Sequence, residues 1–84
     1  MITAIVTSLD QDNLLATPSN DVDVKSLIGK KARYVDKNGK IWPGMVSGSS
    51  DDLFVVVVFE NFPSGLGQGQ MLDILDSPED RMED

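Results

Sequence analysis

The sequence predicts an all-β protein, a small antiparallel barrel of about five strands with at most one short helical turn. Two observations carry this prediction: apolar, β-branched runs of strand length recur along the chain, and Asn38-Gly39 separates two of them. Asn-Gly is a strong hairpin signal because both central residues of a type I′ turn need positive φ, which Asn and Gly tolerate. A chain of 84 residues builds one thin core. We therefore expect residues 1–75 to form a single domain.

The N-terminal segment has the composition of a strand. Ile2–Leu9 is rich in Ile, Val and Thr, which favour extended backbone. We expect Leu14–Ala16 to extend its pairing, and Thr17–Asn20, which contains Pro18, to form a loop. Residues 1–20 are predicted to pack on the barrel, to form an N-terminal extension, or to swap onto a neighbouring copy.

A short helical turn is expected next. Asp23 is placed to cap Val24–Ile28, and Gly29 follows where a helix end favours glycine. The segment is too short for a full helix, which leaves the prediction all-β.

Two strands are predicted on either side of Asn38-Gly39. Lys31–Asp36 alternates in polarity, with its even-numbered residues on one face and its odd-numbered residues on the other, as in a half-buried strand. Lys40–Ser47 continues the sheet, but Pro43 has no N–H for the ladder and Gly44 has no side chain to pack. We expect this strand to bend, to bulge or to lie at an edge.

Leu53–Phe59 is the most apolar run, and we expect it to be the central strand. Both of its faces are apolar. One face is expected to line the barrel, and the other to be covered either by the N-terminal segment or by a partner.

A long loop, a last strand and a tail complete the chain. Asn61–Gln70 contains Pro63 and three glycines, and a loop of this length in so small a domain favours a functional role. Met71–Leu75 is the last predicted strand. Asp76–Asp84 carries five acids and one Arg, which predicts an acidic disordered tail.

Composition excludes several classes of function. The chain has no Cys and no His, which removes disulfides, thiolate nucleophiles, imidazole bases and the usual zinc ligands. Gly65–Gly69 lacks the Lys-Ser/Thr of a phosphate-binding P-loop and precedes a predicted strand rather than a helix. We therefore predict no enzymatic activity, no metal and no cofactor.

The location predicted from the sequence is the cytoplasm. There is no apolar run of the length that spans a membrane, and Met1–Leu9 lacks the basic flank and small-residue cleavage site of a signal peptide. The absence of Cys fits a reducing compartment.

The charge is unevenly distributed along the chain. The net charge is −7, which opposes non-specific binding to nucleic acid. Six of the seven basic residues nevertheless fall within sixteen positions, in company with a single acid, Asp36. The predicted hairpin therefore has either a basic binding face or an ordinary solvated one. The residues are Lys25, Lys30, Lys31, Arg33, Lys37 and Lys40.

The aromatic residues provide a second candidate surface. Tyr34 and Trp42 flank the predicted turn at equal distances, so we expect them to be cross-strand neighbours that line a shallow groove with Phe62. Gly65 and Gly67 of the long loop complete this predicted partner-binding surface. The alternative is that Tyr34 belongs to the core and Trp42 caps the barrel.

Three segments together resemble the SH3-like small barrels, especially the Tudor and KOW kinds. They are Ile28–Tyr34, with its leading glycine, the aromatic-containing Gly39–Val46, and the Val-rich Val55–Glu60, which ends in an acid. The resemblance covers Gly29–Leu75 and implies an SH3-like fold. Val55–Leu75 is also similar to the small photosystem I subunit of SH3-like fold, a likeness of fold that does not carry function.

Three functions are open at this point. We favour a small non-catalytic protein-interaction module, an accessory or inhibitory subunit that docks on a larger protein or complex. A KOW-like domain would instead bind RNA or a ribosome through the basic hairpin, with Lys30, Lys31, Arg33, Lys37 and Lys40 on phosphates. A Tudor-like reader of methylated Lys or Arg would use Tyr34 and Trp42 as cage walls.

Overall fold

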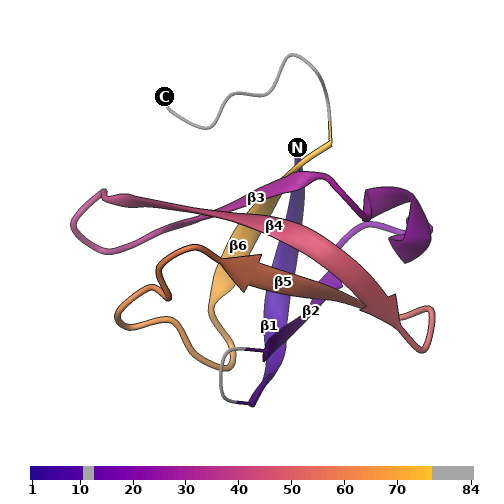
Figure 1. Cartoon of the computed structure of the whole chain (residues 1–84), viewed down its shortest axis with the longest axis horizontal. Coiled ribbons are helices and arrows are strands. Elements are labelled where there is room, and N and C mark those ends of the chain that lie inside the picture. The colour runs from indigo at the N-terminus through magenta and orange to yellow at the C-terminus, as the bar shows by residue number, and fades with distance from the viewer. Residues whose placement is uncertain (11–12, 77–84) are drawn as a thin grey trace.

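The computed structural model describes residues 1–10 and 13–76 and shows a closed antiparallel barrel of six strands (Figure 1). The strand order around the barrel is β1-β2-β5-β4-β3-β6. The all-β prediction is confirmed, with six strands rather than about five. The predicted tail beyond Asp76 lies outside the described residues. The elements are β1 (Ile2–Asp10), β2 (Asn13–Pro18), the 3₁₀ turn η1 (Val24–Leu27), β3 (Lys31–Val35), β4 (Ile41–Ser50), β5 (Phe54–Phe59) and β6 (Met71–Leu75).

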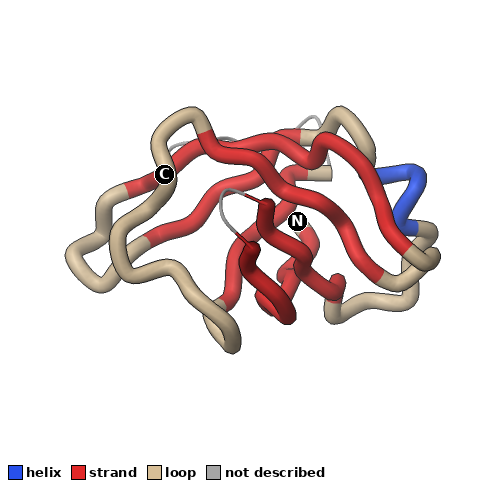
Figure 2. Tube along the Cα trace, turned by 60° about the horizontal axis from the view of Figure 1, so that its bottom comes forward, coloured by secondary structure: helices blue, strands red, loops and turns tan. Residues whose placement is uncertain are grey.

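The topology contains a Greek key. β3, β4 and β5 form a meander, and β6 returns by a long connection to pair with β3. β1 pairs with β6, β2 pairs with β5, and these two pairings close the ring. Figure 2 shows the strands wrapping around a common centre, with loops gathered at the left and right of that view.

The N-terminal segment supplies two strands of the barrel wall. The predicted first strand is present as β1, and the predicted extension of its pairing is present as β2. β2 runs further than expected, because Thr17 pairs with Ile5 and Pro18 with Ala4. The prediction of a loop from Thr17 was therefore wrong by two residues.

The core forms from alternate residues of all six strands. On β5, Val55 and Val57 are fully buried, while Phe54, Val56 and Val58 face outward. Each fully buried Val or Leu contributes about 1.5–3 kcal/mol to stability, so this alternation fixes the register of the barrel. The largest fully buried side chains are Leu14, Ile74, Val6, Val46, Val55 and Val57.

β4 shows the irregularity that Pro43 and Gly44 predict. A bulge lies between Val46 and Gly48, and Pro43 stands opposite Arg33 of β3. Pairing with β5 begins only at Gly44, so Pro43 lies where β4 has no paired neighbour on that side. A proline tolerates this place because no ladder donor is needed, and the prediction is confirmed.

The β3–β4 hairpin forms, but its turn is not of type I′. The Gly39 N–H donates to the Asp36 carbonyl at 3.0 Å, and the Asp36 N–H donates to the Lys40 carbonyl at 3.0 Å. Only Gly39 has positive φ, at 82°, and Asn38 does not. This is the pattern of a three-residue loop, in which a turn is followed by one left-handed residue.

Two consecutive positive φ values occur instead in the β4–β5 turn. Asp51 and Asp52 have φ of 53° and 56°, and the Leu53 N–H donates to the Ser50 carbonyl at 3.1 Å. These are the dihedral signs that a type I′ turn requires, and Asp is among the residues that tolerate them.

The predicted helical turn is confirmed as η1. The Lys25 N–H donates to Oδ1 of Asp23 at 3.1 Å, which is the expected cap. Val24 and Leu27 are buried and extend the core. In the described part of the chain, no helix has the length and apolar character needed to cross a membrane.

Candidate functional site

Asp36, Lys40 and Trp42 form a compact group at the tip of the β3–β4 hairpin, which we call the hairpin cluster. The Trp42 Nε1–H donates to Oδ2 of Asp36 at 3.0 Å, and the backbone N–H groups of Asn38 and Lys40 each donate to Oδ1 at 2.9 Å. The Lys40 Nζ lies 4.2 Å from the centre of the Trp42 ring, within cation–π range. The hydrogen bond from Trp42, helped by those backbone bonds, lowers the pKa of Asp36 below its usual value.

The predicted aromatic surface is mostly turned into the molecule. Tyr34 is buried and stands opposite Trp42 in the register, as expected. Trp42 and Phe62 are half-buried against the core, and Phe62 meets Phe59 edge to face with ring centres 6.0 Å apart. The arrangement thus matches the alternative in which Tyr34 belongs to the core and Trp42 caps the barrel.

The structure brings together part of the predicted partner-binding set. Tyr34, Trp42 and Gly65 line a hollow between the hairpin and the 61–70 loop, together with Asp36 and Lys40. Phe62 and Gly67 are not among its lining residues.

The long loop also has a structural role that sequence reasoning missed. Leu66 is buried and joins the core cluster from the middle of the glycine-rich stretch. A single apolar residue between two glycines is the signal that could have indicated a loop side chain packed into the core.

Arg33 is engaged within the barrel wall. Its Nε lies 3.2 Å from Oδ2 of Asp73, the residue directly opposite on β6, and the Arg33 side chain is only 11% exposed. A bonded, largely buried guanidinium of this kind serves the β3–β6 pairing, so it is a poor candidate for phosphate recognition.

The predicted lysines do not form one patch. Lys30 and Lys31 lie at the start of β3, and Lys37 lies in the turn beyond its other end. Lys40 is held over Trp42. The basic run of the sequence is therefore divided between two ends of a strand.

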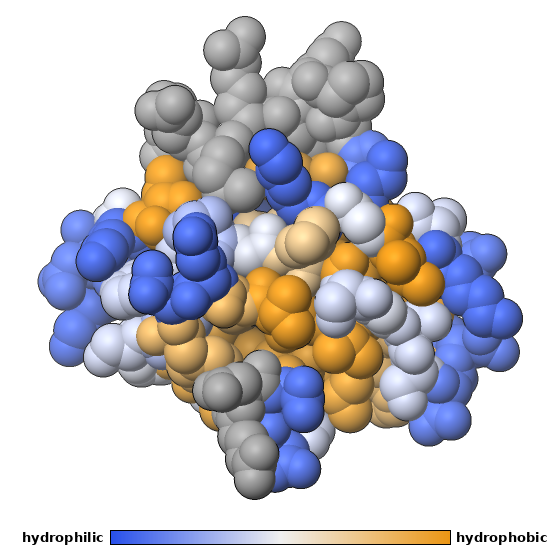
Figure 3. All heavy atoms as spheres, viewed as in Figure 1, coloured by the Kyte–Doolittle hydropathy of each residue, from blue (hydrophilic) through white to orange (hydrophobic). Residues whose placement is uncertain are grey.

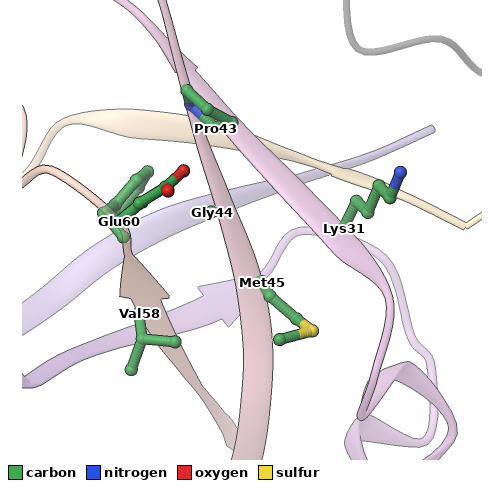
Figure 4. A pocket seen from close by; sticks show the side chains of 7 residues that line it. Lys31, Pro43, Gly44, Met45, Val58 and Glu60 are labelled. Carbon is green, nitrogen blue, oxygen red and sulfur yellow. The ribbon is translucent and has the colours of Figure 1, made fainter.

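A different surface lies on the outside of the barrel, which we call the β4–β5 groove. It is a hollow of about 530 Å³. Figure 4 shows Lys31 and Glu60 on opposite sides of β4, with Met45 and Val58 projecting from their strands. The lining residues are Lys31, Pro43, Gly44, Met45, Val58, Phe59 and Glu60.

Gly44 also lines this groove, and the neighbouring strand leaves no room for a side chain at its position. A Cβ at this position would lie 2.7 Å from the Val58 carbonyl oxygen and 2.8 Å from Cδ1 of Phe59. Phe59 stands opposite Gly44 in the register, so its ring occupies the space that any side chain at position 44 would need. Glycine is thus required by the close approach of the neighbouring strand.

The groove is apolar in the middle and charged at its margins. Met45 and Val58 are directly opposite each other, with 47% and 36% of their surface exposed, so no described segment covers them. Lys31 and Glu60 are also exposed, and within residues 1–10 and 13–76 neither forms an ion pair. Figure 3 shows apolar residues gathered across the middle of the molecule, with hydrophilic residues at its left and right margins.

The sequence contained a signal for this groove. Both faces of Leu53–Phe59 are apolar, which required a cover for the outer face. β2 pairs with β5 side by side within the barrel wall and does not lie over that face. The N-terminal cover was therefore the wrong alternative. Met45 was missed because a single methionine in a strand carries no pattern.

The fold, rather than a relative, defines the class of this protein: a small closed antiparallel β-barrel, compatible with an SH3-like barrel. No known family model matches the chain, and no curated protein is significantly similar to it in sequence. Within the described ranges, acidic side chains do not gather in a group of three or more able to hold a metal ion.

Proposed function

We propose that this protein is a small non-catalytic interaction module that docks on a larger protein or complex through the β4–β5 groove. The observation that carries the proposal is the exposed Met45–Val58 pair beside the Gly44 hollow. Exposed apolar surface that adjoins a hollow and is rimmed by charge is typical of protein-interaction sites.

The closed barrel favours docking through side chains. Each described strand has a paired neighbour on both sides, so a partner has no long free edge to which it could add a strand. At Pro43, where β4 is locally open, the proline offers no donor. Met45 and Val58 are therefore the expected anchors, in place of Trp42 and Phe62, which pack against the core.

The two other functions receive less support. RNA binding through the hairpin would need Arg33, which is paired with Asp73, and lysines that lie at opposite ends of β3. A cage for methylated Lys or Arg would need the face of Trp42, which Lys40 already covers, and Tyr34, which is buried.

The test is capture of partners from the source cell with the tagged full chain, at low and high salt and with and without nuclease. Met45→Glu should lose a partner that survives high salt and nuclease. Met71→Glu should keep it, because Met71 is a similarly exposed methionine on β6, on the opposite side of the barrel.

Two results would count against the proposal. Retention that disappears with nuclease, falls steeply with salt and is lost in the Lys30→Glu, Lys37→Glu double variant, which leaves the groove lining unchanged, would assign the protein to the RNA-binding class. Equal retention by Met45→Glu and by the unchanged protein would show that docking does not use this groove.

A further inference from the structure

We propose that the β4–β5 groove is self-complementary and that two copies of the chain bind through it face to face. This inference goes beyond the proposed function. It assigns a second occupant to the same surface, so that self-association and docking on a larger partner exclude each other.

The positions of the charges carry the inference. Lys31, Met45 and Val58 form one row across β3, β4 and β5, because Lys31 pairs with Met45 and Met45 with Val58. Glu60 follows the end of β5, beside the stretch of β4 that holds Pro43 and Gly44. Two strand spacings of about 4.8 Å and an offset of about 6.6 Å along β5 place Lys31 and Glu60 roughly 12 Å apart on this face, with the apolar residues between them.

Such an arrangement matches its own copy when that copy is turned by a two-fold rotation. In a symmetric dimer, each contact between two different residues occurs twice. A two-fold axis that lies in the plane of the contact and passes between Lys31 and Glu60 places Lys31 of each copy opposite Glu60 of the other. The same rotation packs Met45 and Val58 against Val58 and Met45, which covers the exposed apolar surface of both copies.

Overall charge works against this association. Each copy carries a net charge of −7, so two copies repel each other over distances longer than the groove. Self-association therefore depends on local contacts and should be weak and reversible. At about 0.15 M salt the Debye length is about 8 Å, which screens the general repulsion more than the close pairs.

The experiment is sedimentation equilibrium of the untagged full chain over a wide concentration range, with four variants. We expect a reversible dimer for the unchanged protein. Lys31→Glu and Glu60→Lys should each raise the dimer dissociation constant about tenfold, because each puts like charges opposite each other twice. The double variant Lys31→Glu, Glu60→Lys should return to within about threefold of the original value, since complementarity is restored. Met45→Glu should be monomeric.

The pair of single variants separates local pairing from overall charge. Lys31→Glu makes the net charge more negative, and Glu60→Lys makes it less negative. If overall repulsion alone governed association, the first variant would weaken the dimer and the second would strengthen it. Weakening by both, with recovery in the double variant, arises only from residues that face each other. Both side chains are exposed, so circular dichroism should show an unchanged fold in all three proteins.

Three outcomes would overturn the inference: a monomer at every concentration, single variants that do not both weaken the dimer, or a dimer that persists in Met45→Glu. None of these depends on finding a larger partner. A protein that stays monomeric but loses its captured partner in Met45→Glu would retain the proposed function and refute the dimer. A protein that dimerises as expected but captures no partner would support the dimer and refute the proposed function.

Discussion

The hairpin cluster and the β4–β5 groove differ in how their polar groups are satisfied. In the hairpin cluster, the Asp36 carboxylate accepts three hydrogen bonds and Lys40 covers the Trp42 ring. In the groove, Lys31 and Glu60 flank exposed apolar side chains and form no ion pair with a described residue. A cluster whose polar groups bond to one another stabilises the fold. A surface whose charges have no ion pair and whose apolar side chains are exposed is available to a partner. Variants of the two regions should therefore affect different measurements.

The largest expected effect on stability comes from Gly44→Val, because Gly44 lines the groove and is also a tightly packed part of the barrel wall. The added side chain meets the Val58 carbonyl and the Phe59 ring, and we expect the free energy of unfolding to fall by about 2 kcal/mol, as for overpacked cores. Urea denaturation measures this. Gly48→Val is the matched control, because a Cβ there meets nothing within 4 Å. If the two variants were equally stable, the close packing at Gly44 would be refuted.

A smaller loss is expected from Trp42→Phe, which keeps an aromatic ring but removes the indole N–H. Losing the hydrogen bond to Asp36 should lower the free energy of unfolding by about 1 kcal/mol. Dimerisation and partner capture should remain unchanged, since Trp42 does not line the groove. Loss of binding in a stably folded Trp42→Phe protein would move the functional surface back to the hairpin.

The acid dependence of stability should reveal the Asp36 carboxylate. Hydrogen bonding by Trp42 lowers its folded-state pKa below the ordinary value of 3.8. A group with a depressed pKa stabilises the fold above its unfolded-state pKa, and this contribution is lost as the pH falls through the folded-state pKa. The difference in urea midpoint between the unchanged protein and Asp36→Asn should thus be largest above about pH 5 and should shrink progressively in more acidic solution.

Asp21→Asn provides the comparison for that titration, because Asp21 is exposed and lies outside the hairpin. We expect Asp21→Asn to alter the urea midpoint little, as a substitution on the exposed surface usually does. An Asp36→Asn difference that stayed constant down to pH 2 would show that the carboxylate charge is not what the cluster stabilises.

The smallest effect on stability should come from Met45→Glu. An exposed strand residue usually changes the free energy of unfolding by no more than about 0.5 kcal/mol. The same variant should abolish dimerisation and partner capture, which would complete the contrast with Trp42→Phe. Thermal denaturation followed by circular dichroism provides the stability measurement, and a large drop in the midpoint would mean that Met45 is structural.

Much of the fold could be predicted because local patterns and long-range pairing agree. The alternation in Lys31–Asp36 and the apolar run Leu53–Phe59 each predicted a strand that the barrel contains. Asp23 predicted its cap for the same reason, since the signal and its partner are two residues apart. The geometry of the turn was harder to predict from the sequence. Asn38-Gly39 lies in a hairpin as expected, but the turn is a three-residue loop rather than type I′, because the Asp36 carboxylate accepts hydrogen bonds from two backbone N–H groups of the loop.

The candidate site was harder to predict because it depends on which strands are neighbours. Trp42 and Tyr34 were correctly paired, but whether they faced a partner or the core depended on how the barrel closes, and Leu66 and Phe62 from a distant loop pack into or against the same core. Met45 meets Val58 only because β4 bulges and β5 follows it in register. No pattern within either strand contains that contact.

The position of β6 has a consequence for how this protein is made. β6 lies between β1 and β3, and Ile2 finds its partner in Ile74, almost the whole length of the described chain away. Until that last strand leaves the ribosome, β1 and β3 each present an open edge that can pair with other chains. Contacts of such long sequence separation slow folding. The barrel is therefore expected to close only once β6 is available, and a chain shortened before Met71 should aggregate instead of forming a smaller barrel.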